Sequence, residues 1–359
     1  GVRLTRMLAE APYTRSSVAT LFTGASWRDH GVWLSQHALA PEFTTLAEIL
    51  QEAGYFTLGI TDNANVARSA GSDQGFDEWV QTWSDVRRKV PPGMERWWPE
   101  LPEILWRERL GRGLPADRPV FAYVHLMPPH EPYLPGPEHD VFGPEGYQGP
   151  ITGITPDIQA FDRGEHARGS DDHERLVALY DGGLRRGDAI LGRVLEAWRA
   201  TGRARPTLTV FLSDHGEAFG EHDKYGHNST PHDEMLHVPF VMHPKNLVPA
   251  ALRESPDELR SLGDALPLIL HSLHVPLPRG TTWPAHLLAV LEDPSRGREE
   301  IFVRCSQPIY ARRSADALTV LQLWGRQQHF ALGEDPQALS DLRWEDAEAA
   351  QGRVVHKCA

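Results

Sequence analysis

Phe211-Leu-Ser-Asp-His-Gly-Glu217 is the stretch of sequence that decides the fold class. It continues the apolar run Thr207–Leu212, which reads as a buried strand, so Asp214 and His215 fall just past the strand end. In open α/β sheets ligands bind beyond the carboxyl ends of the strands. A carboxylate beside an imidazole suits a divalent metal, and Gly216 would let the backbone turn there. The alternative for Asp-His alone is a polar turn with a helix cap.

Apolar runs rich in β-branched residues alternate with stretches of helical period along most of the chain. This alternation predicts an α/β fold with a mostly parallel central sheet and helices on both faces. The segment after about residue 285 reads as a smaller appended unit, which divides the chain into 1–285 and 286–359. The predicted strands are Phe56–Ile60, Val120–His125, Thr207–Leu212, Val238–Met242, Ile301–Val303 and Leu318–Leu323, and the clearest helices are Phe43–Glu52 and Glu174–Ala200.

A loop dense in His, Asp and Lys follows the Asp-His pair, with the sequence Gly220-Glu-His-Asp-Lys-Tyr-Gly-His227. Such a loop is poor at forming core and suited to holding an anion near a metal. For His227 we favour a role in the site, and for His222 we favour a surface loop. Lys224 lies between them and could add positive charge.

A second candidate segment is Val124-His-Leu-Met-Pro-Pro-His-Glu-Pro-Tyr133, which follows the predicted strand Val120–His125. Its three prolines restrict the backbone dihedrals and would present His130 rigidly at the strand's carboxyl end. A fixed imidazole can bind an anionic oxygen or protonate a leaving group. The alternative is a proline-rich turn whose histidine bonds only to backbone.

A third candidate segment is Ala11-Pro-Tyr-Thr-Arg-Ser-Ser-Val-Ala-Thr-Leu-Phe-Thr-Gly24. Thr14, Ser16 and Ser17 are residue types that cap helices, and apolar residues follow at helical spacing. A hydroxyl at a helix N-terminus can face an anion, and a neighbouring metal would make it a nucleophile. The alternative is simple helix capping.

Composition narrows the classes of partner. The 359 residues include 36 basic and 49 acidic side chains, a formal charge of −13, which argues against nucleic acid. A small anionic substrate remains compatible, because a metal ion inverts the local field. The two cysteines, Cys305 and Cys358, have no metal-like spacing. We find no apolar run of about 18 residues and no signal peptide.

In this order the three segments resemble the sulfatase family of the alkaline-phosphatase superfamily. Relatives carry a nucleophile ten residues before the glycine that Gly24 matches, which gives Thr14, and a Pro-His-x-Pro-Tyr stretch matched by Pro129–Tyr133. The resemblance implies a three-layer alkaline-phosphatase-like sandwich and one divalent metal (Mn²⁺, Zn²⁺ or Ca²⁺) bound by Thr14, Asp214 and His215. It also implies His130 as a catalytic residue, with His227 and Lys224 binding substrate.

The nucleophile position departs from the pattern of arylsulfatases. Those enzymes have Cys or Ser there, converted to formylglycine, and an Arg four residues on, where this chain has Thr14 and Val18. Threonine cannot form that aldehyde, so no formylglycine is expected. Related phosphodiesterases and phosphoglycerol transferases use threonine, which favours a phosphate ester over a sulfate ester. The expected activity is hydrolysis or transfer of such esters, and the alternative is a non-catalytic binding or scaffold domain.

The resemblance also implies a family strand, ending in metal-binding acids, upstream of Gly1. We therefore expect a further ligand outside these residues, and a sheet that shows a gap or an exposed edge. Substrate contacts are expected from residues 85–118 and 134–173. Relatives are often exported or membrane-tethered, which is the expectation for this chain.

Overall fold

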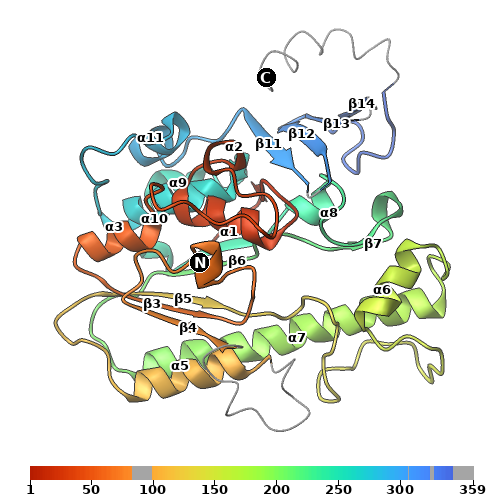
Figure 1. Cartoon of the computed structure of the whole chain (residues 1–359), viewed down its shortest axis with the longest axis horizontal. Helices are drawn as coiled ribbons and strands as arrows, with labels where there is room; N and C mark the ends of the chain where they lie inside the picture. Colours follow the sequence, from red (N-terminus) through yellow and green to blue (C-terminus); the bar gives the residue numbers. More distant parts are fainter. Residues whose placement is uncertain (83–98, 306, 324–326, 343–359) are drawn as a thin grey trace. The chain divides into compact units, whose positions relative to one another are not determined.

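The computed structural model describes residues 1–82, 99–305, 307–323 and 327–342 (Figure 1). It divides into two compact units, each of which is described by itself. Unit 1 comprises residues 1–37, 208–217 and the chain from His227 onward, and unit 2 comprises residues 38–207 and 218–226. The predicted boundary at residue 285 stays a prediction.

Unit 2 is built on a parallel sheet in the order β4-β3-β5, formed by Glu78–Gln81, Phe56–Thr61 and Val120–His125. Helix α3 (Leu46–Glu52) covers one face, while α5 (Leu101–Gly111) and α7 (Asp171–Ala200) lie along the other (Figure 1). Every residue of β3 is buried as a result. The predictions of strands at 56–60 and 120–125 and of helices at 43–52 and 174–200 are confirmed in substance, and a parallel sheet with helices on both faces describes this unit.

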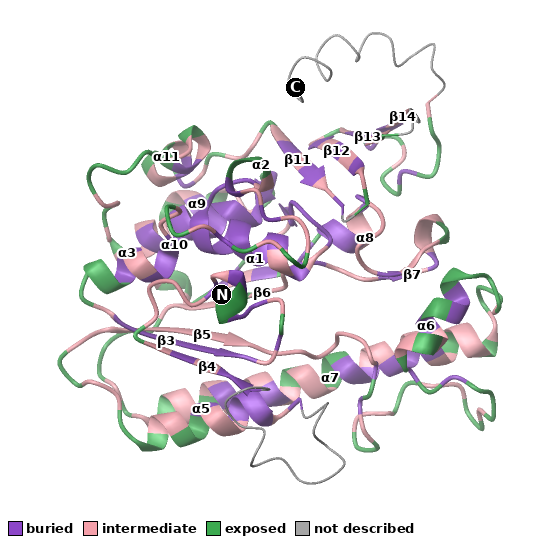
Figure 2. Cartoon of the chain, viewed as in Figure 1, coloured by how far each residue is buried: buried purple, intermediate pink, exposed green. Residues whose placement is uncertain are grey.

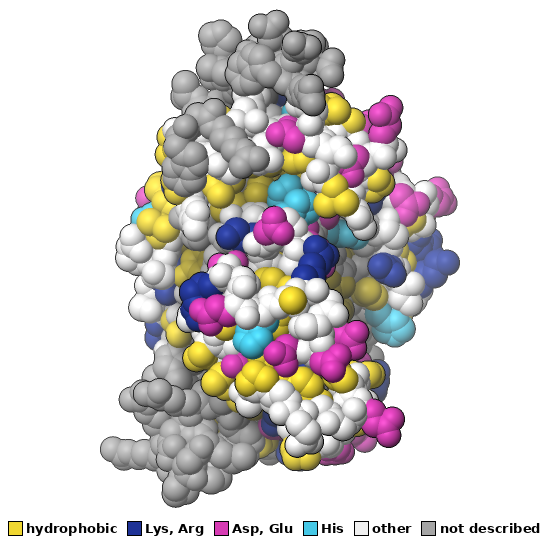
Figure 3. Space-filling view, turned by 90° about the vertical axis from the view of Figure 1, so that its right-hand side faces the viewer, with side chains coloured by type: hydrophobic (Ala, Val, Ile, Leu, Met, Phe, Trp, Pro, Cys, Tyr) yellow, Lys and Arg dark blue, Asp and Glu magenta, His cyan; other side chains and the backbone are white. Residues whose placement is uncertain are grey.

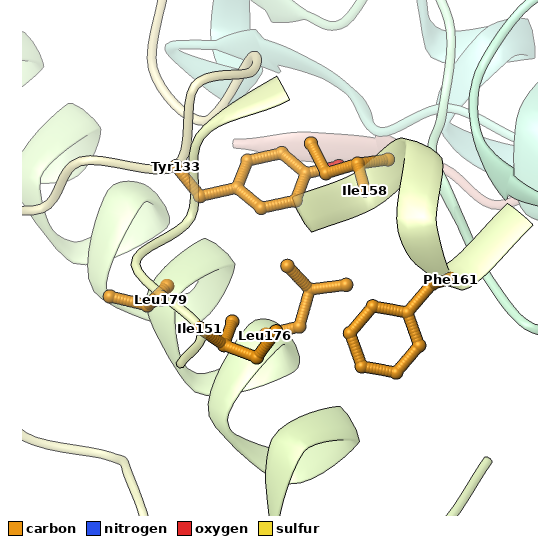
Figure 4. Close-up of a cluster of buried hydrophobic side chains, with 6 residues drawn as sticks. All are labelled: Tyr133, Ile151, Ile158, Phe161, Leu176 and Leu179. Atoms are coloured by element: carbon orange, nitrogen blue, oxygen red, sulfur yellow. The ribbon is translucent and has the colours of Figure 1, made fainter. Parts of the chain in front are cut away.

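The predicted long loop at 134–173 is largely irregular but contains a helix, α6 (Thr155–Asp162). Its apolar residues form a separate buried cluster against α7 (Figure 4). That cluster consists of Tyr133, Ile151, Ile158, Phe161, Leu176 and Leu179. The 3-10 turn η1 (Arg68–Ala70), the pair β7 (Ala218–Phe219) with β8 (Tyr225–Gly226), and the turn η2 (Glu221–Asp223) complete the unit.

The described part of the segment 85–118 contributes to the core of unit 2 through Trp106. Trp106 on α5 is 3 % exposed, donates its indole N–H to Val194 O, and stacks on Trp198. Trp83, Trp97 and Trp98 lie outside the described residues.

The main sheet of unit 1 has the order β1-β9-β6 and is antiparallel, with strands Val2–Leu4, Phe240–His243 and Thr209–Leu212. The expectation of a mostly parallel sheet therefore does not hold in this unit, although β2 (Met7–Leu8) and β10 (Arg260–Ser261) pair in parallel. Among the described residues no strand pairs with the second edge of β6, and Phe211 on it is 45 % exposed.

Helices of unit 1 gather around α1 (Thr14–Thr23) and α10 (Ala265–Leu273), whose side chains are mostly buried (Figure 2). The other helices among the described residues of this unit are α2 (Trp27–His30), α8 (Asp233–Leu236), α9 (Ala250–Glu254) and α11 (Ala285–Glu292), with 3-10 turns η3 (Lys245–Leu247) and η4 (Leu262–Asp264). In the part of the chain that the structure describes, no helix is long and apolar enough to span a membrane.

A four-stranded antiparallel sheet in the order β11-β12-β13-β14 follows α11. Its strands are Glu300–Arg304, Ile309–Ser314, Ala317–Gln322 and Gln327–Ala331. The predicted strands at 301–303 and 318–323 lie within it.

Candidate active site

The turn that follows β6 is fixed by close backbone contact with α8. The N–H of Gly216 donates to Met235 O at 2.8 Å, and the N–H of Glu217 donates to Glu234 O at 3.0 Å. A Cβ atom on Gly216 would lie 2.1 Å from Glu234 O. Glycine is therefore required by the close approach of α8 rather than by the turn itself, which refines the reason given from sequence. These contacts fix the backbone of the turn that carries Asp214 and His215.

Thr14 is the first residue of α1 and is 2 % exposed. The helix begins after Tyr13, whose side chain makes no capping hydrogen bond, and Ser17 Oγ donates to Ala11 O at 2.8 Å. The alternative that the hydroxyl of Thr14 serves as a helix cap is therefore wrong. That hydroxyl is directed to a different partner.

The partner of Thr14 is His215. Its Nε2 atom lies 3.1 Å from Thr14 Oγ1 and 3.7 Å from a carboxylate oxygen of Asp214. On the other side of the ring, Nδ1 lies 2.8 Å from Gly216 O and must donate its proton to that carbonyl. Nε2 then carries the lone pair, so it accepts from the Thr14 hydroxyl in this structure. A hydroxyl, a carboxylate and an imidazole thus converge at one buried point.

His227 lies on the other face of His215. The two imidazole rings stack with centroids 4.6 Å apart, and Nδ1 of His227 lies 3.0 Å from Oε1 of Glu217. The Glu217 side chain is 5 % exposed, so this carboxylate orients the ring from within the protein. The role of Glu217 was not predicted from the sequence. The only signal for it was its place at the end of the Ser-Asp-His-Gly-Glu motif.

His130 belongs to unit 2 and is held rigidly there. Its N–H donates to Met127 O at 2.8 Å, its Nδ1 lies 2.6 Å from Glu131 O, and the peptide bonds before Pro129 and Pro132 are cis. Lys224, also in unit 2, forms an ion pair with Asp162 at 3.6 Å and is 39 % exposed. The roles of His130 and Lys224 at the Thr14 site stay predictions.

The loop that carries His130 rests on α7 at a group of glycines that was not recognised in the sequence. A Cβ on Gly182 would lie 2.7 Å from Pro135 Cβ and 2.8 Å from His139 O, and one on Gly183 would lie 3.3 Å from Pro129 Cβ. Arg186 Nη1 adds a hydrogen bond to Leu134 O at 2.8 Å. Adjacent glycines inside a long helical pattern were the available signal.

The residues at the convergence point fit a divalent metal in part. Within the described residues, no group of three His, Cys, Asp or Glu side chains is arranged to hold a metal ion. Thr14, Asp214 and His215 nevertheless offer three donor atoms, with His215 held in the tautomer that ligation requires. A tetrahedral zinc site takes four ligands, so these three would need a fourth.

Comparison with known proteins identifies the family. Residues 1–275 match the sequence model of the family described as Sulfatase, and the chain therefore belongs to the sulfatase family. It is 26 % identical over 243 residues to an arylsulfatase of Clostridium perfringens, a match that covers 63 % of this chain and 50 % of that protein. It is 28 % identical over 261 residues to an ulvan-active sulfatase of Formosa agariphila, covering 67 % of this chain and 48 % of the relative. The chain spans about half the length of these curated relatives.

Solved structures agree on the fold. The phosphonate monoester hydrolase of Agrobacterium radiobacter superposes with a TM-score of 0.67 at 19 % identity, covering 99 % of this chain and 87 % of that one. At this identity the likeness establishes the α/β fold of sulfatases and alkaline phosphatases, which confirms the fold class predicted from the sequence.

Proposed function

We propose that this chain is the core of a metal-dependent hydrolase or transferase of phosphate or sulfate esters that uses Thr14 as its nucleophile. The observation that carries the proposal is the 3.1 Å approach of Thr14 Oγ1 to His215 Nε2, beside Asp214. A nucleophile must face the groups that activate it. A hydroxyl that capped the helix would instead be directed at the backbone. Membership of the sulfatase family supplies the class of reaction.

The proposed reaction assigns a task to each residue of the chain. Asp214 and His215 would bind one divalent ion with Thr14, and that ion would lower the pKa of the Thr14 hydroxyl and polarise an ester oxygen. Thr14 Oγ1 then loses its proton to solvent and attacks phosphorus or sulfur, forming a covalent threonine ester as the bond to the leaving group breaks. His227, oriented by Glu217, holds a non-bridging oxygen or protonates the leaving oxygen.

Hydrolysis or transfer of the covalent threonine ester would complete the cycle. Water, or an acceptor alcohol in a transferase, attacks the threonine ester and restores the Thr14 hydroxyl. We assign His130 to leaving-group protonation and Lys224 to charge stabilisation, as predicted from the family motifs. Mn²⁺, Zn²⁺ and Ca²⁺ are the candidate ions.

Threonine favours phosphoryl over sulfuryl chemistry. Its Cβ bears a methyl group, so oxidation there cannot give the formylglycine aldehyde on which arylsulfatases depend. A phosphonate monoester hydrolase among the structural neighbours supports the compatibility of the fold with phosphorus chemistry. The substrate class that we propose is a small anionic ester, which follows from the reaction class of the family. The net charge of −13, with acidic and basic side chains interspersed on the face drawn in Figure 3, argues against nucleic acid as the substrate.

A non-catalytic binding or scaffold domain is the second candidate. The observation that favours it is the small number of candidate metal ligands. Among the described residues, we assign only Asp214 and His215 to the metal beside Thr14. Val18 also stands where arylsulfatases have arginine.

Metal binding and ester turnover, measured together, distinguish the two candidates. Titration calorimetry with Mn²⁺, Zn²⁺ and Ca²⁺ would be combined with hydrolysis of p-nitrophenyl phosphate, bis-p-nitrophenyl phosphate and p-nitrophenyl sulfate. We expect one bound ion, lost in Asp214→Ala, and turnover that falls at least about 10³-fold in Thr14→Ala. The matched control is Thr23→Ala, which removes a buried hydroxyl at the other end of the same helix that donates to Ala19 O and accepts from the N–H of Ala25. Full turnover in Thr14→Ala excludes the nucleophile. Absence of both binding and turnover in the wild type means either that the metal needs a ligand outside these residues or that the domain is non-catalytic.

A further inference from the structure

Asn228, the residue after His227, has a left-handed backbone conformation with a φ of +78°. Side chains other than glycine rarely adopt this region, and asparagine tolerates it better than most. A left-handed residue reverses the local direction of the chain, so His227 and the residues after it need not lie along one extended line. Because Asn228 directly follows His227, its backbone conformation affects where this proposed site residue lies.

The backbone of Asn228 reaches the segment that carries the nucleophile. Its N–H donates to Pro12 O at 3.0 Å, two residues before Thr14. This bond joins two segments that are distant in sequence and both in unit 1. It is a backbone bond, so it fixes the main chain beside His227 and not only a side-chain rotamer.

These contacts close a ring around the proposed site. Thr14 Oγ1 lies 3.1 Å from His215 Nε2, and the His215 ring stacks on His227 at 4.6 Å. His227 is covalently joined to Asn228, whose N–H bonds to Pro12, and Pro12 leads back through Tyr13 to Thr14. Nδ1 of His227 lies 3.0 Å from Oε1 of Glu217. The Asn228–Pro12 bond ties the main chain directly after His227 to the segment directly before Thr14.

We propose that Asn228 is a positioning residue for the reaction: its left-handed conformation directs its N–H to Pro12 O and so holds His227 in register with Thr14. This inference rests on the proposed function. The expected effect is geometric. A small displacement of a group that stabilises the transition state lowers kcat more than it weakens substrate binding.

Two substitutions at position 228 separate backbone conformation from side-chain chemistry. Asn228→Gly removes the amide side chain but adopts positive φ freely, and we expect it to retain at least about half of kcat. Asn228→Val keeps the N–H but resists positive φ, and we expect kcat to fall about tenfold with KM changed less than about twofold. Turnover would be measured with Mn²⁺ and bis-p-nitrophenyl phosphate.

A double-mutant cycle with His227→Ala tests whether Asn228 acts through that histidine. If it does, Asn228→Val should cost little further kcat once His227 is already alanine. The matched control is His274→Val, which places valine at an exposed left-handed position, φ +55°, at the end of α10. We expect this control to lose stability while keeping kcat.

Amide hydrogen exchange at position 228 gives a readout independent of activity. The amide should be protected in the wild type and in Asn228→Gly, and lose protection in Asn228→Val. A wild-type amide that exchanges freely, a kcat of Asn228→Val equal to wild type, or fully additive effects with His227→Ala would each overturn the inference. Failure of the proposed function is distinguishable, because it appears as undiminished turnover in Thr14→Ala or as no turnover in the wild type, whereas failure of the positioning role appears in the exchange, Asn228→Val and double-mutant results.

Discussion

The hydroxyl of Thr14 lies 3.1 Å from Nε2 of His215, although the two residues are 201 positions apart in the sequence. Two local features produce this contact. Helix α1 begins without a side-chain cap, which leaves the hydroxyl of its first residue available. The turn after β6 is pressed against α8, and the N–H of His215 Nδ1 is committed to Gly216 O, so Nε2 faces the helix start.

Gly216→Ala is expected to disrupt the turn after β6 that carries Asp214 and His215. The added Cβ would meet the carbonyl oxygen of Glu234 at 2.1 Å, a backbone atom of α8 that cannot rotate away. We expect a loss of about 3 kcal/mol in the free energy of unfolding, measured by urea denaturation, and loss of metal affinity. Gly192→Ala is the control, since nothing lies within 4 Å of its Cβ on α7, and it should stabilise by about 0.5–1 kcal/mol. Equal stabilities of the two variants would contradict the steric account.

The glycines of α7 are expected to rank by the space available to a Cβ atom. At Gly182 the neighbours are Pro135 Cβ at 2.7 Å and His139 O at 2.8 Å, while at Gly183 the nearest is Pro129 Cβ at 3.3 Å. Gly182→Ala should therefore destabilise by about 2 kcal/mol, and Gly183→Ala by less than about 1 kcal/mol. Turnover should fall in the same order, because the displaced loop carries His130. Thermal unfolding and kcat would be compared with Gly192→Ala, and a reversed order would refute the packing argument.

Much of the fold was predictable because buried strands have a strong local signature. The runs at 56–60, 120–125 and 207–212 are rich in apolar and β-branched residues, and each contains a strand. Strand direction has no such signature, so the antiparallel β9 was read as part of a mostly parallel sheet. Strand β4 was missed because Glu78–Gln81 is only four residues long and has a polar residue at each end.

The site was predictable only as far as family motifs reach. Thr14, Asp214 and His215 were selected by resemblance, and the structure brings them together. The Glu217–His227 pair and the Asn228–Pro12 bond were not anticipated, because each depends on contacts between segments that carry no mark of it in sequence. A backbone bond in particular leaves no trace in residue type, except that asparagine suits the left-handed conformation.

His30 is expected to make stability depend on pH below neutrality. Burial lowers its pKa from 6.5 to about 4, with Asp29 opposing the shift, and its ring links Thr20 Oγ1 at 3.0 Å to the N–H of Val32. The unfolded state therefore binds a proton near pH 6.5 that the folded state does not, so stability is present above pH 6.5 and declines as pH falls toward 4. The full loss is about 3 kcal/mol.

His30→Asn should flatten this decline between pH 4 and 6.5, with unfolding free energies measured in urea at each pH. The same substitution at exposed His243 controls for the change of residue type. A profile for His30→Asn that keeps the wild-type slope would show that another group is responsible.

A buried ionic cluster supports the segment that leads to Thr14. Arg298 pairs with Asp264 at 2.7 Å and with Glu10 at 3.7 Å, and Ser261 Oγ donates to Glu10 Oε1 at 2.7 Å. One guanidinium thus faces two carboxylates. Burial raises the pKa of Glu10 despite Arg298, whereas at Asp264 the charge of Arg298 and its hydrogen bonds outweigh burial and lower the pKa.

These opposite shifts predict unequal costs of substitution within the cluster. Arg298→Met would leave Asp264 buried and unpaired, at a cost of about 3–5 kcal/mol near pH 7. Glu10→Gln should cost far less, because the fold already favours the protonated form of Glu10 and the Gln carbonyl can still accept from Ser261. Arg163→Met, which removes an exposed ion pair with Glu165, is the control and should have little effect.

The pH dependence provides the sign test for Glu10. Because its folded pKa lies above the ordinary value of 4.5, the folded state holds a proton that the unfolded state releases, and wild-type stability declines as pH rises through the folded pKa. Glu10→Gln should abolish this decline and leave the remaining pH dependence intact, as measured by urea unfolding from pH 4.5 to 8. If Glu10→Gln is as costly as Arg298→Met, or keeps the decline, then Glu10 is ionised in the fold and forms the principal ion pair with Arg298.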